Sequence, residues 1–276
     1  MRKPDESIAS RQNALIKLTA SLTERKYRAR EGLFRFDGKK LFLEALDKKL
    51  PLFAVLLRAS AAPALLAAAG DLDVPAACRV ALLDDDLFDR LSEEKSPDGV
   101  ICVSKVLDKI HKFATIDVSD AKGDGFTLLL ESVRDPGNLG TVIRSARAFG
   151  VERVILSADC ADLYHPRTVR AAMGALFCQP VTVVEDLPAA VTALARCGRM
   201  FAAALTPDAV PLDKIEWQPG DAAVVGNEGH GLTAATLTAC THRLLIPMTG
   251  DVESLNAGVA ASVILWDYAR GGERHG

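Results

Sequence analysis

The sequence carries residues suited to holding an anion near the start of one predicted helix. In residues 128–156 (LLLESVRDPGNLGTVIRSARAFGVERVIL), an apolar run is followed by a turn signal at 135–137, and Asn138 is predicted to cap the next helix. Gly140 and Arg144 lie four residues apart and therefore share one face of that helix. Arginine suits bidentate contact with phosphate, so Arg144 is a candidate anion-binding residue; the alternative is an ordinary surface arginine.

A second apolar run leads directly into a glycine-rich loop, in residues 221–232 (DAAVVGNEGHGL). Three glycines within six residues allow the backbone to approach a ligand closely. A dinucleotide-binding fingerprint would need G-x-G-x-x-G early in a βαβ unit, with an acidic residue about 20 positions later, so a nicotinamide site is disfavoured. Glu228 is unusual in such a loop because a turn needs no glutamate.

The third segment, residues 244–265 (LLIPMTGDVESLNAGVAASVIL), places polar residues at the start of a helix rich in small side chains. Ile246 and Met248 end the apolar run and offer apolar contact to a flat base. Ser254 and Asn256 follow at the N-terminal end of the predicted helix. Glycine and serine inside a helix cost stability relative to alanine, so residues 257–262 indicate that something packs very close to this backbone.

These segments belong to a predicted α/β domain. Its strands are apolar throughout rather than alternating, which is typical of a parallel sheet covered on both faces by helices. Ligands bind such sheets beyond the carboxyl ends of the strands, where all three polar segments fall. The expected strands are 126–133, 151–157, 180–184, 199–205, 221–228 and 242–248, and the expected helices are 139–148, 167–176, 187–197, 233–239 and 256–270.

The N-terminal part predicts a smaller α/β domain. Helical periodicity in residues 9–32 is followed by expected strands at 33–36, 50–57, 78–83 and 99–106, with expected helices at 39–48, 60–70 and 84–94. Charge and turn residues fill the stretch after residue 105. We therefore expect three parts: an N-terminal domain (1–105), a linker (106–124) and a C-terminal domain (125–276).

Charge and composition restrict the partners. Residues 1–50 hold 13 Lys and Arg against 7 Asp and Glu, a net charge of +6, while the whole chain has −3. A basic N-terminal part indicates an RNA- or membrane-facing surface, or simply solvated helices. The six cysteines form no CxxC pair, which disfavours a zinc site or disulfides and suits the cytoplasm. His165, His230 and His242 lie in no metal or triad pattern, and no apolar run reaches the ~18–20 residues that cross a bilayer.

Taken together, the three segments resemble the three motifs of the SpoU (TrmH-like) branch of the SPOUT methyltransferases. The resemblance covers about residues 126–270, in the family's order and spacing. Residues 10–46 resemble the substrate-binding domain of the members that act on ribosomal RNA. The resemblance to the SPOUT methyltransferases implies a parallel sheet with a deep C-terminal trefoil knot, a homodimer, and S-adenosylmethionine as cofactor. The small side chains of 257–262 would then let the last helix pass through a loop and pack against a partner subunit.

The resemblance also implies roles for individual residues. Arg144 would orient the 2′-hydroxyl and a neighbouring phosphate, since a guanidinium is not deprotonated in proteins and so does not suit a general base. The catalytic set is Asn138, Arg144, Glu228, Ser254 and Asn256, with Asn256 capping the last helix. The cofactor-binding set is Leu205, Gly226, Asn227, Glu228, Gly229, Ile246, Met248, Ser254, Leu255 and Asn256. The RNA-binding set is Arg11, Lys17, Arg25, Lys26, Arg28 and Arg30, with no metal.

The sequence therefore predicts an S-adenosylmethionine-dependent methyltransferase that modifies a ribose 2′-hydroxyl of RNA. Ribosomal RNA is favoured because of the N-terminal domain. Two alternatives remain: a transfer-RNA 2′-O-methyltransferase, and a non-catalytic RNA-binding or ribosome-assembly factor.

Overall fold

The computed structural model describes residues 1–108, 110–113, 125–227, 229–250 and 254–272. The chain forms two compact units. One comprises Met1–Leu107 together with Asp162–Phe177, and the other comprises Asp108–Ala161 with Cys178–Gly276. The segment 162–177 thus groups with the N-terminal residues, whereas the sequence placed it in the C-terminal domain. Within the described residues, no helix has the length and apolar character needed to cross a membrane.

The first unit is built on a five-stranded mixed sheet, ordered β1-β4-β3-β5-β2. Strand β5 runs antiparallel to both β2 and β3, and the other pairs are parallel. The strands are β1 (Glu6–Ile8), β2 (Leu33–Asp37), β3 (Leu52–Arg58), β4 (Arg79–Leu83) and β5 (Val100–Lys105). The helices are α1 (Ala14–Ser21), α2 (Arg25–Glu31), α3 (Lys39–Asp47), α4 (Ala62–Ala69), α5 (Asp85–Leu91) and α7 (Pro166–Ala172), with a 3₁₀ turn η1 (Ala175–Phe177).

The helical N-terminal segment divides into α1 and α2. The hydroxyls of Ser21 and Thr23 donate to the carbonyls of Leu18 and Ala20, at 2.8 and 3.0 Å. Such local bonds compete with helix continuation, and the chain turns before α2 begins at Arg25.

The second unit contains an eight-stranded sheet ordered β11-β13-β10-β12-β7-β8-β9-β6, in which every pair is parallel. The strands are β6 (Ile110–Phe113), β7 (Thr127–Leu130), β8 (Arg153–Ser157), β9 (Val181–Val184), β10 (Met200–Ala203), β11 (Val210–Pro211), β12 (Ala222–Val225) and β13 (His242–Leu245). The predicted parallel sheet is confirmed, and the trefoil knot stays a prediction. Strand β6 lies in the stretch that was expected to be a linker.

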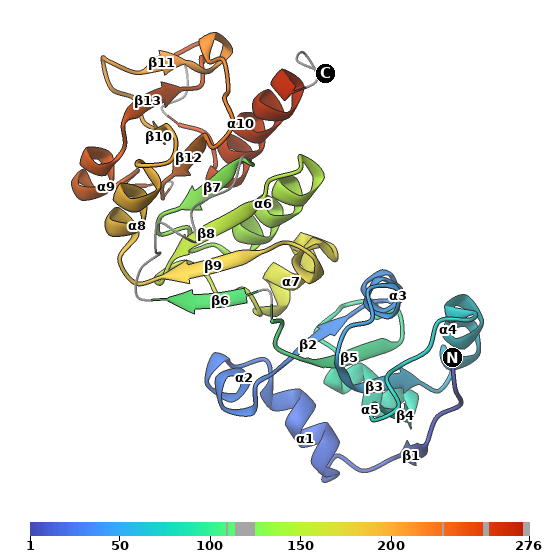
Figure 1. Cartoon of the computed structure of the whole chain (residues 1–276). Helices are drawn as coiled ribbons and strands as arrows, with labels where there is room; N and C mark the ends of the chain where they lie inside the picture. The colour runs from blue at the N-terminus through green and yellow to red at the C-terminus, as the bar shows by residue number, and fades with distance from the viewer. Residues whose placement is uncertain (109, 114–124, 228, 251–253, 273–276) are drawn as a thin grey trace. The chain divides into compact units, whose positions relative to one another are not determined.

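Helices cover both faces of this sheet, as its apolar strands require (Figure 1). Helices α6 (Pro136–Ala148) and α10 (Ala257–Gly272) pack together on one face. Helices α8 (Leu187–Leu194) and α9 (Ala234–Ala239) pack together on the other, and a short 3₁₀ turn η2 (Leu212–Lys214) follows β11. The order of the strands sets the carboxyl ends of β13, β10, β12, β7 and β8 side by side, so the three polar segments of the sequence emerge at one edge.

Candidate active site

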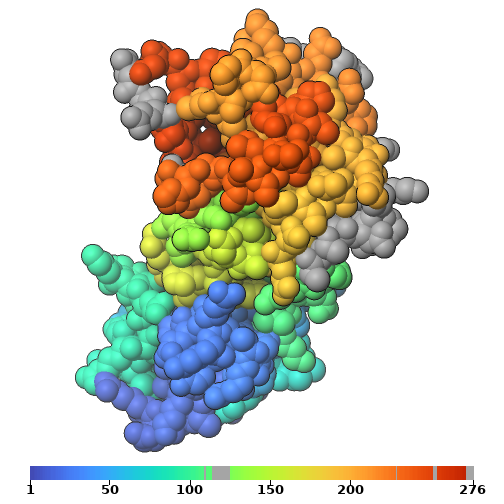
Figure 2. Space-filling view, turned by 90° about the vertical axis from the view of Figure 1, so that its left-hand side faces the viewer, coloured from blue at the N-terminus to red at the C-terminus, as the bar shows by residue number. Residues whose placement is uncertain are grey.

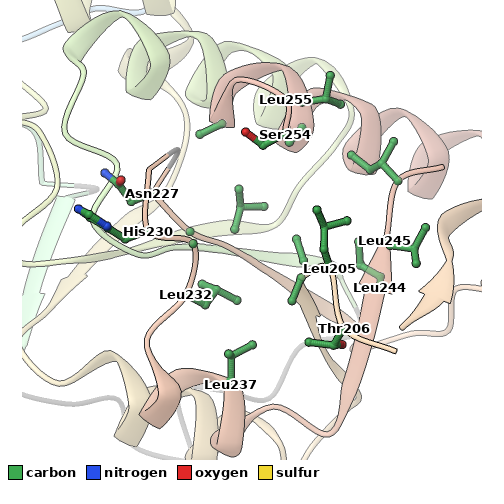
Figure 3. Close-up of a pocket in the computed structure, with 18 of the residues that line it drawn as sticks. Leu205, Thr206, Asn227, His230, Leu232, Leu237, Leu244, Leu245, Ser254 and Leu255 are labelled. Carbon is green, nitrogen blue, oxygen red and sulfur yellow. The ribbon is translucent and has the colours of Figure 1, made fainter. Parts of the chain in front are cut away.

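A cavity of about 380 Å³ lies beyond the carboxyl ends of β10, β12 and β13. In the space-filling view the surface is hollowed between the orange and red segments, which are the parts of the chain that line it (Figure 2). Side chains from these three strands, from α9 and from the start of α10 surround a common space (Figure 3). Seven residues of the predicted cofactor set line it: Leu205, Gly226, Asn227, Ile246, Met248, Ser254 and Leu255.

The cavity walls are mainly apolar. Leu232 and Leu237 line one part of it, and Leu205, to their right in Figure 3, keeps 66% of its surface exposed. Polar groups come from Asn227, Ser254 and the backbone that continues past the strand ends. A mostly apolar cavity with a few placed polar groups is typical of a small-molecule site. Gly229 and Asn256 are not among the lining residues, and Glu228 falls outside the described residues.

The loop after β12 is a tight hairpin. The backbone amides of Asn227 and Gly231 donate to each other's carbonyls at 3.2 and 2.9 Å, and the Asn227 Oδ1 accepts from the Gly229 amide at 2.8 Å. A side chain at Gly226 would collide with the backbone of Gly231 and Leu232, so only glycine fits there. Gly226 therefore serves the close approach of two backbone segments.

Two residues connect this hairpin to the end of β7. The Asn227 amide Nδ2 donates to the Ser132 carbonyl at 2.9 Å. The buried Glu131 carboxylate accepts from the Thr233 amide, the Thr233 hydroxyl and the Thr236 hydroxyl at 2.8, 2.9 and 2.6 Å. Glu131 thereby fixes the N-terminus of α9, which bears Leu237. Glu131 is not among the residues predicted from the sequence, where its only signal is a charge at the end of an apolar run.

The first and third polar segments meet where α6 packs on α10. The Asn256 Nδ2 donates to the Asn138 Oδ1 at 3.0 Å, and the Ser145 and Ser262 hydroxyls lie 2.7 Å apart. A Cβ at Gly258 would come within 3.6 Å of the Asn138 backbone. The small side chains of α10 therefore allow close contact with α6.

The structure corrects one cap and supports another. Asp135, not Asn138, is the N-cap of α6, and its Oδ1 accepts from the Asn138 amide at 2.9 Å. Asn138 lies within the first helical turn. Asn256 does cap α10: its Oδ1 accepts from the amides of Gly258 and Val259 at 2.9 and 3.3 Å.

Arg144 lies on α6, exposed to solvent and outside the set that lines the cavity. Among the described residues it has no hydrogen-bond or ion-pair partner, so its guanidinium is available to bind an anion. Its catalytic role stays a prediction, as do the roles of Asn138, Ser254 and Asn256.

The histidines and cysteines have ordinary explanations. His165 caps α7, the His242 ring hydrogen bonds to the Thr241 hydroxyl at 2.8 Å, and His230 is an exposed residue at the cavity. All six cysteines are free thiols. In the part of the chain that the structure describes, no three His, Cys, Asp or Glu side chains are placed to hold a metal ion.

The basic residues of the first unit differ in exposure. Arg11, Lys17, Arg25, Lys26 and Arg30 are exposed. Arg28 is only 4% exposed: its guanidinium pairs with Asp162 at 2.6 Å and donates to the carbonyls of Leu22 and Thr23 at 2.7 and 2.6 Å. Arg28 is therefore structural, which corrects its inclusion among the RNA-binding residues.

Comparison with known families and proteins agrees with this architecture. Residues 125–266 match the model of the SpoU rRNA Methylase family, and residues 13–102 match that of the MRM3-like substrate binding domain. The chain belongs to the SpoU rRNA methylase family.

Three relatives illustrate the similarity. The chain is 31% identical to the 23S rRNA (guanosine(2553)-2′-O)-methyltransferase RlmP of Bacillus subtilis, over 95% of this chain and 98% of that protein. The S-adenosylmethionine-bound rRNA methyltransferase of Sinorhizobium meliloti superposes with a TM-score of 0.77 at 25% identity, over 98% of this chain and 97% of that one. The SpoU methyltransferase AviRb of Streptomyces viridochromogenes, also in complex with S-adenosylmethionine, superposes with a TM-score of 0.78 at 25% identity. The match covers 95% of this chain and 99% of that one.

Proposed function

We propose that this protein transfers a methyl group from S-adenosylmethionine to a ribose 2′-hydroxyl of ribosomal RNA. The observation that carries the proposal is the apolar cavity at the carboxyl ends of β10, β12 and β13, which is lined by residues of two family motifs. The relative RlmP is named as a 23S rRNA 2′-O-methyltransferase, and the two solved relatives hold S-adenosylmethionine. The transfer-RNA alternative is less favoured by these relatives.

The residues present fit the cofactor. S-adenosylmethionine combines a flat adenine with polar and charged groups, and when bound it supplies an electrophilic methyl group. Leu205, Ile246 and Leu255 would enclose the apolar surface of the base, and Asn227 and Ser254 offer hydrogen-bonding groups beside the backbone of the loops. Predominantly apolar walls with a few convergent polar groups suit such a ligand.

The chain's own residues would position the RNA. A guanidinium is a fork of N–H donors and no acceptor, so Arg144 would bind and orient the 2′-oxygen and an adjacent phosphate rather than remove a proton. Asn138 and Asn256 are fixed to each other at the α6–α10 contact, so the end of the cavity formed by Ser254 and Leu255 is held in register with the helix that bears Arg144. Holding reactants in register in this way lowers the barrier to transfer.

A second copy of the chain would cover the exposed side of the α6–α10 pair. A shallow groove there is lined by Thr141, Ser145, Phe149, Gly258, Val259, Ser262, Val263 and Trp266. Val259 and Trp266 are 48% and 54% exposed, an apolar surface of the kind that marks an interface. We expect sedimentation to give a dimer for the wild type and a monomer for Trp266→Asp. A monomeric wild type would contradict the homodimer.

The first unit would bind the RNA through its exposed basic residues. On α2, the charged groups of Lys26 and Arg30 lie 4.8 and 4.9 Å from the centre of the Tyr27 ring. Contacts from basic side chains to the phosphates of RNA position the RNA without reading its sequence. A ribosomal RNA substrate would put the protein in the cytoplasm, together with the ribosomes.

The proposal is tested by supplying labelled S-adenosylmethionine with separate pools of unmethylated ribosomal and transfer RNA. Wild type and the control Arg196→Ala, an exposed arginine after α8, should label ribosomal RNA at a 2′-oxygen, mapped by nuclease digestion. Arg144→Ala should lose about 100-fold in rate, the effect of removing one positioned donor. Label on transfer RNA alone would change the substrate, and no label on either pool, with RNA bound, would favour the assembly factor.

A further inference from the structure

A hydrogen-bonded cluster lies at the carboxyl ends of β7 and β8, outside the cavity lining. The Asp159 carboxylate accepts from the Ser132 and Ser157 hydroxyls, each at 2.6 Å, and from the Arg134 guanidinium at 3.1 Å. The Ser157 hydroxyl in turn accepts from the Ser132 amide at 2.9 Å. Both strand ends thus contribute to fixing one carboxylate.

The backbone at this cluster is held in an unfavourable conformation. Ser132 has a φ of +56°, in the left-handed region that non-glycine residues seldom adopt. Its carbonyl accepts from Asn227, and the neighbouring Val133 carbonyl accepts from the Ala161 amide at 2.9 Å. Conformations of this kind persist where surrounding contacts determine them, and they concentrate at functional sites.

Asp159 is ionised at neutral pH. Partial burial opposes its charge, but the bonds from Ser132, Ser157 and Arg134 outweigh that effect and keep its pKa below the ordinary value. Because the Ser132 and Ser157 hydroxyls hold the Asp159 carboxylate in place, the carboxylate fixes the position of the Arg134 guanidinium that pairs with it.

Arg134 itself remains open to solvent, with 70% of its side chain exposed. Of its five N–H donors, one is used within the described part of the chain, by Asp159. An exposed ion pair contributes little to stability, so stability does not account for a cluster built around this contact. Arg134 directly precedes Asp135, the cap of α6, and lies four residues before Asn138. An anchored guanidinium with spare donors at this position suits a phosphate.

We propose that Arg134 binds a backbone phosphate of the RNA substrate, close to the nucleotide that is methylated. The inference rests on the proposed function, but it concerns binding and can be measured without turnover. It adds to Arg144 a second cation, on the loop before α6, that touches the substrate.

The test compares wild type, Arg134→Ala, Arg134→Lys and the matched control Arg196→Ala. Binding of in vitro transcribed ribosomal RNA is measured by filter retention at several salt concentrations, and S-adenosylmethionine binding by calorimetry. Arg134→Ala should weaken RNA binding about tenfold, as loss of a charge-assisted contact does, and lower the slope of log affinity against log salt by about 0.7–0.9. Arg134→Lys should restore the slope but only part of the affinity, because lysine cannot bind bidentately.

The cofactor affinity and the control define the other outcomes. Wild-type affinity for S-adenosylmethionine in Arg134→Ala would show that the cavity is intact, and Arg196→Ala should bind RNA as wild type does. The inference is overturned if Arg134→Ala keeps the wild-type affinity and slope, if Arg196→Ala loses as much, or if Arg134→Ala also loses the cofactor. Absence of methyl transfer by the wild type would instead count against the proposed function and leave this binding measurement decisive.

Discussion

The side chain of Asn256 joins two helices: it caps α10 through its Oδ1 and donates through its Nδ2 to Asn138 on α6, at 3.0 Å. One residue therefore sets both the start of α10 and its contact with the segment that leads to Arg144. The two functions of this amide can be separated by substitution.

Asn256→Asp should keep the cap but lose the donor to Asn138. We expect its free energy of unfolding, measured in urea, to stay near the wild-type value, because aspartate is an equally good cap. Methyl transfer should fall, because the new carboxylate faces the Asn138 Oδ1. Asn256→Ala, the control that loses both bonds, should also lose about 1 kcal/mol of stability. Full activity in Asn256→Asp would show that the contact with Asn138 is dispensable.

Gly258 should tolerate no large side chain. A Cβ there would lie 3.1 Å from the Asn256 Oδ1 and 3.6 Å from the Asn138 backbone, so Gly258→Val would force α10 away from α6. Overpacking of this kind costs about 1–3 kcal/mol, which urea denaturation would detect. Ala67→Val, which adds side-chain volume at an exposed position of α4, is the control and should be close to neutral for folding. A wild-type stability for Gly258→Val would contradict the close packing.

Glu131 should prove necessary for a stable site. Glu131→Gln presents an amide to three donors and leaves the fully buried Thr236 hydroxyl poorly paired, at a cost of about 1–3 kcal/mol in the free energy of unfolding. Because Glu131 fixes α9, calorimetry should also show weaker binding of S-adenosylmethionine. Glu185→Gln, an exposed glutamate after β9, is the control, and equal behaviour of the two variants would argue against this role.

His165 should make stability depend on pH. Burial and then the charge of Arg28 lower the pKa of His165 below 6.5. Its Nδ1 accepts from the Arg167 amide at 3.1 Å and so caps α7 in the neutral state. A group whose pKa is depressed by folding stabilises fully above its unfolded pKa of about 6.5, and this contribution is lost as pH falls through the folded value.

The free energy of unfolding should therefore decline between about pH 7 and 5 in the wild type, and less steeply in His165→Asn, whose amide caps without titrating. His165→Ala should be less stable than both at pH 7. Parallel pH profiles for wild type and His165→Asn would rule out this contribution.

Much of the second unit could be predicted because its strands are short, apolar and bounded by glycine or proline. The strands that were missed have little of this pattern. Strand β6 is a mostly exposed edge (IHKF) within a charged stretch, and β1 and β11 have three and two residues. Such strands form because they pair with a strand that is distant in the sequence, and their own residues give no signal of that pairing.

The errors in the site have a similar origin. Pro136 at the first helical turn was a usable signal that Asp135, rather than Asn138, caps α6. No local signal could show that Arg28 pairs with Asp162, 134 residues away, or that Glu131 meets Thr233 and Thr236. The residues around the cavity were predictable only because three motifs were considered together.

The order of the strands also has a consequence for synthesis of the protein. Strand β12 enters the sheet between β7 and β10 although it follows both in the chain, and α10 then packs on α6, which was made more than 100 residues earlier. A nascent chain translated to residue 250 contains all eight strands described for the sheet, but not Ser254, Leu255 or the helix capped by Asn256. The cavity is therefore complete only once α10 has packed on α6, and long-range closure of this kind is slow.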